Sequence, residues 1–193
     1  MTDTVTKHAL AELVPLGSRV LDLGCGDGTM MAHLQQTRRC TGYGIEIDDA
    51  NVLACVQRGV NVIQLNLDEG LAMFADASFD VVLQLDTLQH LRNAEVMLLE
   101  TVRVGRVGII AFPNFAHWPN RLSVLRGRMP VTKRLPYQWY DTPNIRVGTH
   151  ADLQTLAQRS GLTVLDRFGL QNGRTVRFAP NLLAGTSVYT LSR

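Results

Sequence analysis

The sequence has few cysteines, and their positions predict neither disulfides nor a zinc site. Only three occur, an odd number without a Cys-x-x-Cys pair, at Cys25, Cys40 and Cys55. Disulfide frameworks and zinc sites both depend on paired spacings that this chain lacks. We therefore expect reduced thiols, no metal centre and a cytoplasmic protein.

Long apolar runs are also missing, as is a secretion signal. No uninterrupted apolar stretch approaches the ~18 residues that suggest a membrane helix. The first residues show no basic region followed by an apolar core, which is the pattern of a signal peptide. The formal net charge is only +2. We expect no membrane association, and the total charge gives no argument for a nucleic-acid partner.

What the chain does contain is a regular alternation of strand and helix patterns. Its 193 residues are 46% apolar, enough for one three-layer core. Strands are predicted at 19–23, 41–46, 60–65, 79–85 and 107–112, and helices at 7–14, 29–36, 49–58 and around 96–102. Such units predict a parallel sheet with right-handed crossovers. Two later strands, 162–168 and 187–191, are expected to form an antiparallel C-terminal edge. The sequence thus predicts one domain over 1–193 with a doubly wound, Rossmann-like α/β sheet.

A glycine-rich turn after the first strand predicts a pocket for S-adenosylmethionine (SAM) or its product S-adenosylhomocysteine (SAH). The strand ends at Asp22, and glycines follow at 24, 26 and 28. Glycines let a turn pass closely beneath a ligand. The backbone there can face the methionine carboxylate, and Asp22 can orient the ammonium. The predicted ligand contacts in this turn are Asp22, Gly24, Cys25, Gly26 and Gly28.

An acidic residue at the end of the second strand completes this pattern. Glu46 can accept hydrogen bonds from both ribose hydroxyls, because ligands bind at the carboxyl ends of strands in a doubly wound sheet; Ile47 follows it. A dinucleotide fingerprint is the alternative. The dinucleotide fingerprint requires a third glycine where this chain has Thr29, and it does not require the acid that this chain has at Asp22. We therefore favour a class I methyltransferase-like SAM site.

Two further segments are expected to complete the pocket. After the third strand come Asn66, Leu67 and Asp68, where Asn66 or Asp68 could accept from the adenine amine. The alternative is that Asp68 caps the turn that follows. The fourth strand ends near Gln84, which we also assign to the ligand site.

The catalytic residues stay unknown from the sequence. Asp86, His90 and His117 are the groups that could assist deprotonation of an acceptor. Plainer roles compete with this reading, because Asp86 could cap the next helix and His90 could pack against it. The chain has no Asn-Pro-Pro-Tyr sequence after the fourth strand and no cysteine in a catalytic context.

A long insert at about 113–148 interrupts the strand and helix pattern. It begins after a strand that ends with Phe112, and a capping pattern at Thr149 and Asp152 then starts the next helix. Half of the chain's aromatic residues lie in the insert or directly before it: Phe112, Phe115, Trp118, Tyr137, Trp139 and Tyr140. Between Thr101 and Tyr140 there are seven basic residues and no acid. Such a mixture is typical of a protein interface or, less readily, an RNA channel; a lid over the site is the alternative.

The insert also carries the most specific resemblance. Phe-Pro-Asn-Phe at 112–115, Gly-Arg-Met-Pro-Val at 127–131 and the run 135–145 resemble the MetW family of bacterial methionine-biosynthesis proteins. Further matching stretches lie at 20–28, 42–48, 58–64 and 103–106. The family resemblance implies a class I methyltransferase fold and a link to homoserine O-acetyltransferase. Asn66 departs from the acid usual in the family, although an amide can still accept from adenine.

The resemblance implies a protein that acts by contact. No Gly-x-Ser-x-Gly nucleophile elbow occurs, so the chain should not acylate homoserine alone. We expect a SAM- or SAH-binding partner that assists or activates homoserine O-acetyltransferase. The alternative is a SAM-dependent methyltransferase of a small molecule, and an RNA methyltransferase is a distant third.

Overall fold

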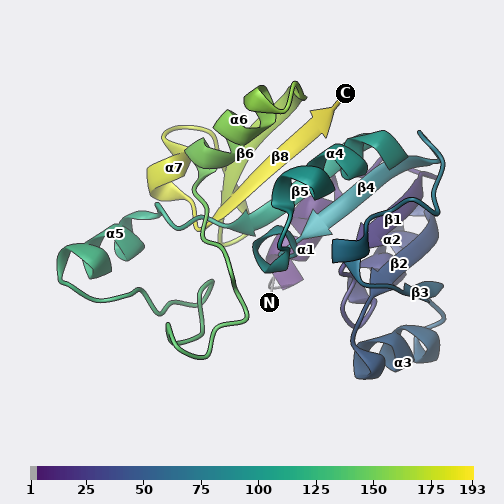
Figure 1. The fold of residues 1–193 in the computed structure, drawn as a ribbon, viewed down its shortest axis with the longest axis horizontal. Helices are drawn as coiled ribbons and strands as arrows, with labels where there is room; N and C mark the ends of the chain where they lie inside the picture. The colour runs from purple at the N-terminus through teal and green to yellow at the C-terminus, as the bar shows by residue number, and fades with distance from the viewer. Residues whose placement is uncertain (1–3) are drawn as a thin grey trace.

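The computed structural model describes residues 4–193, which form one mixed sheet with helices on both faces (Figure 1). The strand order is β3-β2-β1-β4-β5-β8-β6-β7. Strands β1 to β5 are parallel to one another, whereas β8 runs antiparallel to both β5 and β6. The fold is therefore the expected α/β sheet, mostly parallel with an antiparallel C-terminal edge.

Several predicted strands have the expected bounds. The strands are β1 Arg19–Leu23, β2 Thr41–Glu46, β3 Val62–Gln64, β4 Phe79–Leu85, β5 Gly105–Pro113, β6 Thr163–Gln171, β7 Arg174–Val176 and β8 Thr186–Ser192. The predictions for β1, β2 and β4 are confirmed at both ends. β3 is shorter than predicted, and β7 was not predicted at all. Because β7 has three residues and a mostly exposed pattern, it lacks the apolar run by which strands are found.

Most of the helices cover the two faces of the sheet as separate layers. They are α1 Thr4–Ala11, α2 Thr29–Arg38, α3 Asp49–Gln57, α4 Ala94–Val104, α5 Trp118–Leu125, α6 His150–Arg159 and α7 Pro180–Leu183. Val20 of β1 packs into a core with residues of α1, α2 and α3. Leu21 and Leu23 pack into a second core with α4 and α6. These three side chains are fully buried, which explains the apolar run of this strand.

The insert (113–148) contains one helix that the sequence did not reveal. α5 follows Pro113 and has a proline in its first turn, where proline is tolerated. In Figure 1, α5 and the chain after it extend away from the sheet on the left of the view. The predicted capping box at Thr149 and Asp152 is confirmed at the start of α6.

One buried side chain links the start of the insert to α6 and to the end of α7. Asn114 is 1% exposed, and its Nδ2 donates to the carbonyl oxygens of Asn181 at 3.1 Å and Ala184 at 2.8 Å. Its Oδ1 accepts from the backbone N–H of His150 at 3.1 Å. A buried amide satisfied in this way fixes where the insert leaves and rejoins the core.

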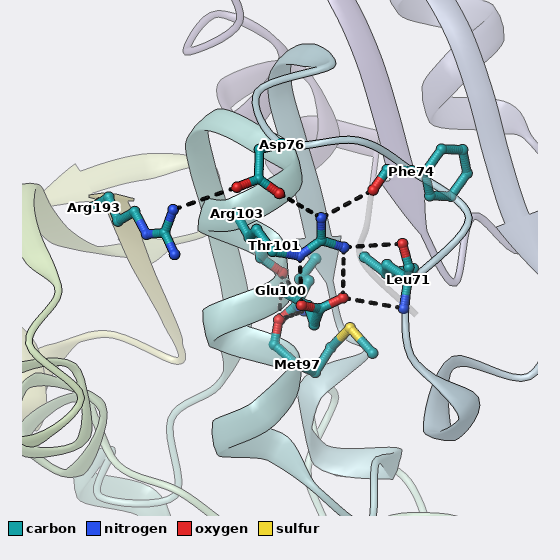
Figure 2. A network of polar contacts seen from close by, with 9 residues as sticks. Leu71, Phe74, Asp76, Met97, Glu100, Thr101, Arg103 and Arg193 are labelled. Atoms are coloured by element: carbon teal, nitrogen blue, oxygen red, sulfur yellow. Dashed lines mark hydrogen bonds and ion pairs between the residues drawn. The ribbon is translucent and has the colours of Figure 1, made fainter.

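A second network holds the loop between β3 and β4 against α4 (Figure 2). The guanidinium of Arg103 donates to Glu100 at 2.7 Å and Asp76 at 2.8 Å. It also donates to the backbone carbonyls of Leu71 and Phe74. One side chain of α4 thereby holds three points of the loop, which follows the short 3-10 helix η1 (Leu67–Glu69).

Within residues 4–193, no helix is long and apolar enough to cross a membrane. The same part of the chain holds no cluster of three or more potential metal ligands.

Candidate functional site

The glycine turn after β1 adopts a left-handed backbone conformation at each of its three glycines. Gly24, Gly26 and Gly28 have φ values of 71°, 56° and 76°, a region that L side chains rarely adopt. A Cβ at Gly24 would also lie 2.7 Å from Oγ1 of Thr87. Glycine is therefore required at position 24 for both reasons, and the turn brings bare backbone to the edge of the sheet.

Two adjoining cavities lie at this edge, beyond the carboxyl ends of the parallel strands. The first has a volume of about 380 Å³ and the second about 430 Å³. Gly24, Asp86 and His90 line both cavities. The two cavities therefore meet at the turn after β1 and the segment after β4, as expected for a doubly wound sheet.

Most of the predicted ligand contacts line one cavity or the other. Asp22, Gly24, Cys25 and Gly26 line the first cavity. Glu46, Ile47, Asn66, Leu67 and Asp68 line the second. The structure thus brings together residues from three separate segments, which follow β1, β2 and β3, in two groups that match the expected methionine and adenosine ends of the ligand.

Two predicted contacts do not reach either cavity. A Cβ at Gly28 would lie 2.8 Å from Sγ of Cys55, so this glycine allows α3 to approach. Gln84 is fully buried, and its Nε2 donates to Oγ1 of Thr101 at 2.8 Å. It points into the layer between the sheet and α4. Alternate residues of a strand face opposite sides, and the sequence did not reveal which side Gln84 would take.

Asp22 lies buried at the floor of the first cavity. It is 2% exposed, and burial raises its pKa to about 7, while the nearby Lys7 lowers and Glu46 raises it. Burial penalises the charged form of a carboxyl group. A cationic group placed beside Asp22 would favour its ionised form, which is what a ligand ammonium would do.

Glu46 is held by the backbone at the mouth of the second cavity. Its Oε2 accepts from the N–H of Gly26 at 2.8 Å, and its Oε1 accepts from Ile47 at 2.8 Å and Asp48 at 3.0 Å. A carboxylate has about four lone-pair positions. One position therefore stays available for a ligand hydroxyl, and the others orient the group.

The segment after β3 resolves one question that the sequence left open. Oδ1 of Asn66 accepts from the N–H of Asp68 at 3.1 Å and caps η1. The alternative that Asp68 is the cap is wrong, because Asp68 instead accepts from the N–H of Arg92 at 2.9 Å. Asn66, with its amide, and Asp68, with its carboxylate, both line the second cavity.

The three catalytic candidates separate into two groups. Asp86 and His90 line both cavities, whereas His117 lines neither. Burial lowers the pKa of His117, so its neutral form is favoured. Asp86 does not cap the following 3-10 helix η2 (Leu88–His90), because the cap position belongs to Thr87. Its backbone has φ 57°, and its Oδ1 is 2.8 Å from Nη2 of Arg134.

The insert covers the first cavity with only part of its residues. The lining includes Arg134, Pro136, Tyr137, Pro143 and Asn144. Trp118, Trp139 and Tyr140 are 52%, 71% and 71% exposed. The residues of the insert that line the cavity therefore fit the interpretation as a lid, and the exposed aromatic residues fit the interpretation as an interface. Sequence reasoning missed Lys7, Arg134 and Asn144 as cavity residues; only the run of bases pointed toward Arg134.

Comparison with known proteins gives a family match over almost the whole chain. The family model described as "Methionine biosynthesis protein MetW" matches residues 5–191. A relative from Rhodopirellula baltica, the "Bifunctional methionine biosynthesis protein MetXA/MetW", is 35% identical over 207 residues. The match covers 100% of this chain and 33% of that relative. About half of this chain is also similar to two mycobacterial methyltransferases. These matches cover only 39% and 35% of the length of those two proteins.

Solved structures show the fold of SAM-dependent methyltransferases. One from Mesorhizobium loti gives a TM-score of 0.72 at 14% identity, with 98% of each chain covered. The [4+2]-cyclase SpnF gives a TM-score of 0.69 at 15% identity, covering 97% of this chain and 80% of the cyclase. At such identities the likeness concerns the fold alone, and function must be argued from the site.

Proposed function

The chain belongs to the MetW family of methionine-biosynthesis proteins, and on that premise we propose that it binds SAM or SAH and assists homoserine O-acetyltransferase by contact. The proposal includes a cytoplasmic location and a single domain over 1–193. Under this proposal, neither a nucleic acid nor a membrane is a partner of the chain.

The observation that carries the ligand proposal is the placement of two carboxylates at the two ends of one crevice. Asp22 lines the first cavity and Glu46 the second, and the bare glycine turn lies between them. SAM and SAH have an amino-acid end and a ribosyl-adenine end. Asp22 would orient the ammonium, and the free acceptor position of Glu46 would accept from a ribose hydroxyl. Leu67 and Ile47 offer apolar contact to the adenine in the second cavity.

The ligand carries its own reactive group, because the sulfonium of SAM can donate a methyl group when bound. The residues described here would bind and orient the ligand. SAH would occupy the same contacts without that capacity. The proposal requires binding and does not require transfer.

The fused relative supports the choice of partner. In the bifunctional MetXA/MetW protein, a part like this chain is joined to a part named MetXA, which we take to be the homoserine O-acetyltransferase. Fusion keeps two proteins at high effective concentration. The exposed aromatic residues Trp118, Trp139 and Tyr140 suit such a contact, since interface anchors are enriched in Trp, Tyr and Arg.

The direct experiment combines binding with an assay of homoserine acetylation. The acyltransferase from the same organism is mixed with this chain, and the complex is measured by analytical ultracentrifugation. Acetylation is then assayed with and without the chain. We expect a complex and faster acetylation. Absence of both would disprove the partner proposal, whereas absence of SAH binding in calorimetry would disprove the ligand proposal separately.

A methyltransferase acting on a small molecule is the second candidate. The observation in its favour is the position of Asp86 and His90, which line both cavities, next to space bounded by Tyr137 and Asn144. Proximity alone can account for much of such catalysis. Release of SAH from SAM in the presence of a cell extract would favour this candidate, provided that Asp86→Asn and His90→Gln abolish the release.

A further inference from the structure

This inference rests on the proposed function, under which the two cavities indicate where the sulfur of a bound ligand would lie. The methionine part would lie in the first cavity with Asp22, and the adenosine part in the second with Glu46. The sulfur joins these two parts, so it would lie where the cavities meet. The residues that line both cavities are Gly24, Asp86 and His90. Asp86 is the carboxylate among them.

Asp86 is held at this junction by its backbone and by a partly buried ion pair. Its N–H donates to the carbonyl oxygen of Ala111 in β5 at 2.8 Å. Its Oδ1 lies 2.8 Å from Nη2 of Arg134, and the two side chains are only 17% and 16% exposed. Charges removed from water interact more strongly than a surface pair, and salt screens them less.

Arg134 belongs to the insert, so the ion pair joins the crevice to the insert. Other contacts join the same two segments. The carbonyl oxygen of Gln89 accepts from the N–H groups of Ile145 and Arg146 at 3.1 and 3.2 Å. A ring nitrogen of His90, Nδ1, is 3.1 Å from the carbonyl oxygen of Pro143. The wall of the crevice after β4 therefore holds the insert in place.

We propose that the Asp86–Arg134 ion pair reads the charge on the ligand sulfur and transmits it to the insert. SAM carries a positive sulfonium, and SAH carries a neutral thioether. A sulfonium at the junction attracts the Asp86 carboxylate and repels the Arg134 guanidinium, which weakens the tie between them. SAH leaves the pair intact. The insert is therefore held less tightly with SAM than with SAH.

This coupling gives the proposed partner surface a means of sensing the ratio of the two ligands. The exposed aromatic residues of the insert are on the same segment as Arg134. By linkage, a partner that prefers one arrangement of the insert must shift the relative affinity for SAM and SAH by the same factor. The inference deepens the proposed function, because it requires ligand binding in this crevice.

Affinities measured by calorimetry test the ion pair, with two variants that should act in opposite directions. Asp86→Asn keeps the shape of the side chain, and asparagine tolerates the left-handed backbone at this position. We expect SAM to bind more weakly by on the order of tenfold, with SAH changed less than about twofold. Arg134→Gln removes the repulsion and should raise the affinity for SAM relative to SAH.

A matched control is available in the same segment. Asp141 is an exposed carboxylate of the insert that lines neither cavity, so Asp141→Asn should leave both affinities unchanged. Damage to the fold would lower both affinities together. An equal loss of SAM and SAH in Asp86→Asn, or a fall in relative SAM affinity in Arg134→Gln, would overturn the inference.

Hydrogen exchange of the backbone amides tests transmission to the insert. Exchange across 132–146 is compared for the full chain without ligand, with saturating SAH and with saturating SAM. We expect exchange to be several-fold faster with SAM than with SAH, and this difference to vanish in Asp86→Asn. Equal protection by the two ligands would overturn the inference while leaving the proposed function standing. If neither ligand binds, both fail.

Discussion

The Glu46 carboxylate accepts a hydrogen bond of 2.8 Å from the backbone N–H of Gly26, which joins the end of β2 to the glycine turn after β1. The side chain that would hold the ribose thus also holds the turn that would face the methionine carboxylate. Because one group serves both ends of the crevice, its removal should affect ligand binding more than the loss of a single contact to ribose.

The first prediction concerns this residue. Glu46→Ala should weaken SAH binding by about 1–3 kcal/mol, since a partly buried acceptor is lost from the ligand and the turn. Calorimetry provides the measurement. Glu69→Ala is the control, because Glu69 is an exposed acid in η1 that lines neither cavity. Unchanged affinity in Glu46→Ala would show that the crevice does not bind ribose here.

The second prediction follows from the pKa of Asp22, which burial raises from 3.8 to about 7. In the unliganded protein, the contribution of this carboxyl group to stability is fully present below pH 3.8 and is lost as pH rises through 7. Asp22→Asn should therefore gain stability relative to the parent chain as pH rises from 5 to 8. Urea unfolding at several pH values measures this difference.

The same titration should appear in ligand binding. An ammonium beside Asp22 favours the ionised carboxylate. SAH should thus bind more tightly at pH 8 than at pH 6, by up to on the order of tenfold, and this rise should be absent in Asp22→Asn. A pH dependence that persists in the variant would place its origin in another group.

The third prediction separates the lid from the interface with two aromatic residues of the insert. Tyr137 lines the first cavity, whereas Trp139 is 71% exposed and lines neither cavity. Tyr137→Ala should weaken SAH binding, and Trp139→Ala should weaken association with the acyltransferase by about 2 kcal/mol. Both affinities are measured for both variants, with circular dichroism to confirm folding. Loss of ligand binding in Trp139→Ala, with a normal complex, would favour a small-molecule methyltransferase.

The fourth prediction concerns stability. Arg103 joins α4 to the loop before β4 through Leu71, Phe74 and Asp76, also pairs with Glu100 in its own helix, and is 21% exposed. Arg103→Ala should lower the free energy of unfolding by roughly 2 kcal/mol, because Glu100 and two carbonyl groups lose their donor. Arg106→Ala is the control, since Arg106 is 71% exposed and lies 3.9 Å from Asp80. That change should cost less than about 0.5 kcal/mol. Equal losses in the two variants would contradict a special role for the Arg103 network.

The sequence alone determined the local features of the crevice. The bounds of β1, β2 and β4 and the position of the glycine-rich turn were predictable, because strand burial and turn formation depend on neighbouring residues. The capping box at Thr149 and Asp152 was predictable for the same reason. Asp22 and Glu46 followed, because the ends of parallel strands meet at one edge of a sheet.

Only the tertiary structure decided which distant segments meet there. Asp86 and Arg134 are 48 residues apart, and Tyr137 differs from Trp139 in facing the cavity although only one residue separates them. The inward orientation of Gln84 and the packing of Gly28 against Cys55 were decided in the same way. Hydrophobic periodicity reports the faces of a regular element, but the insert has no period over most of its length. Its arrangement depends on long-range packing and ion pairing, which leave no local pattern in the sequence.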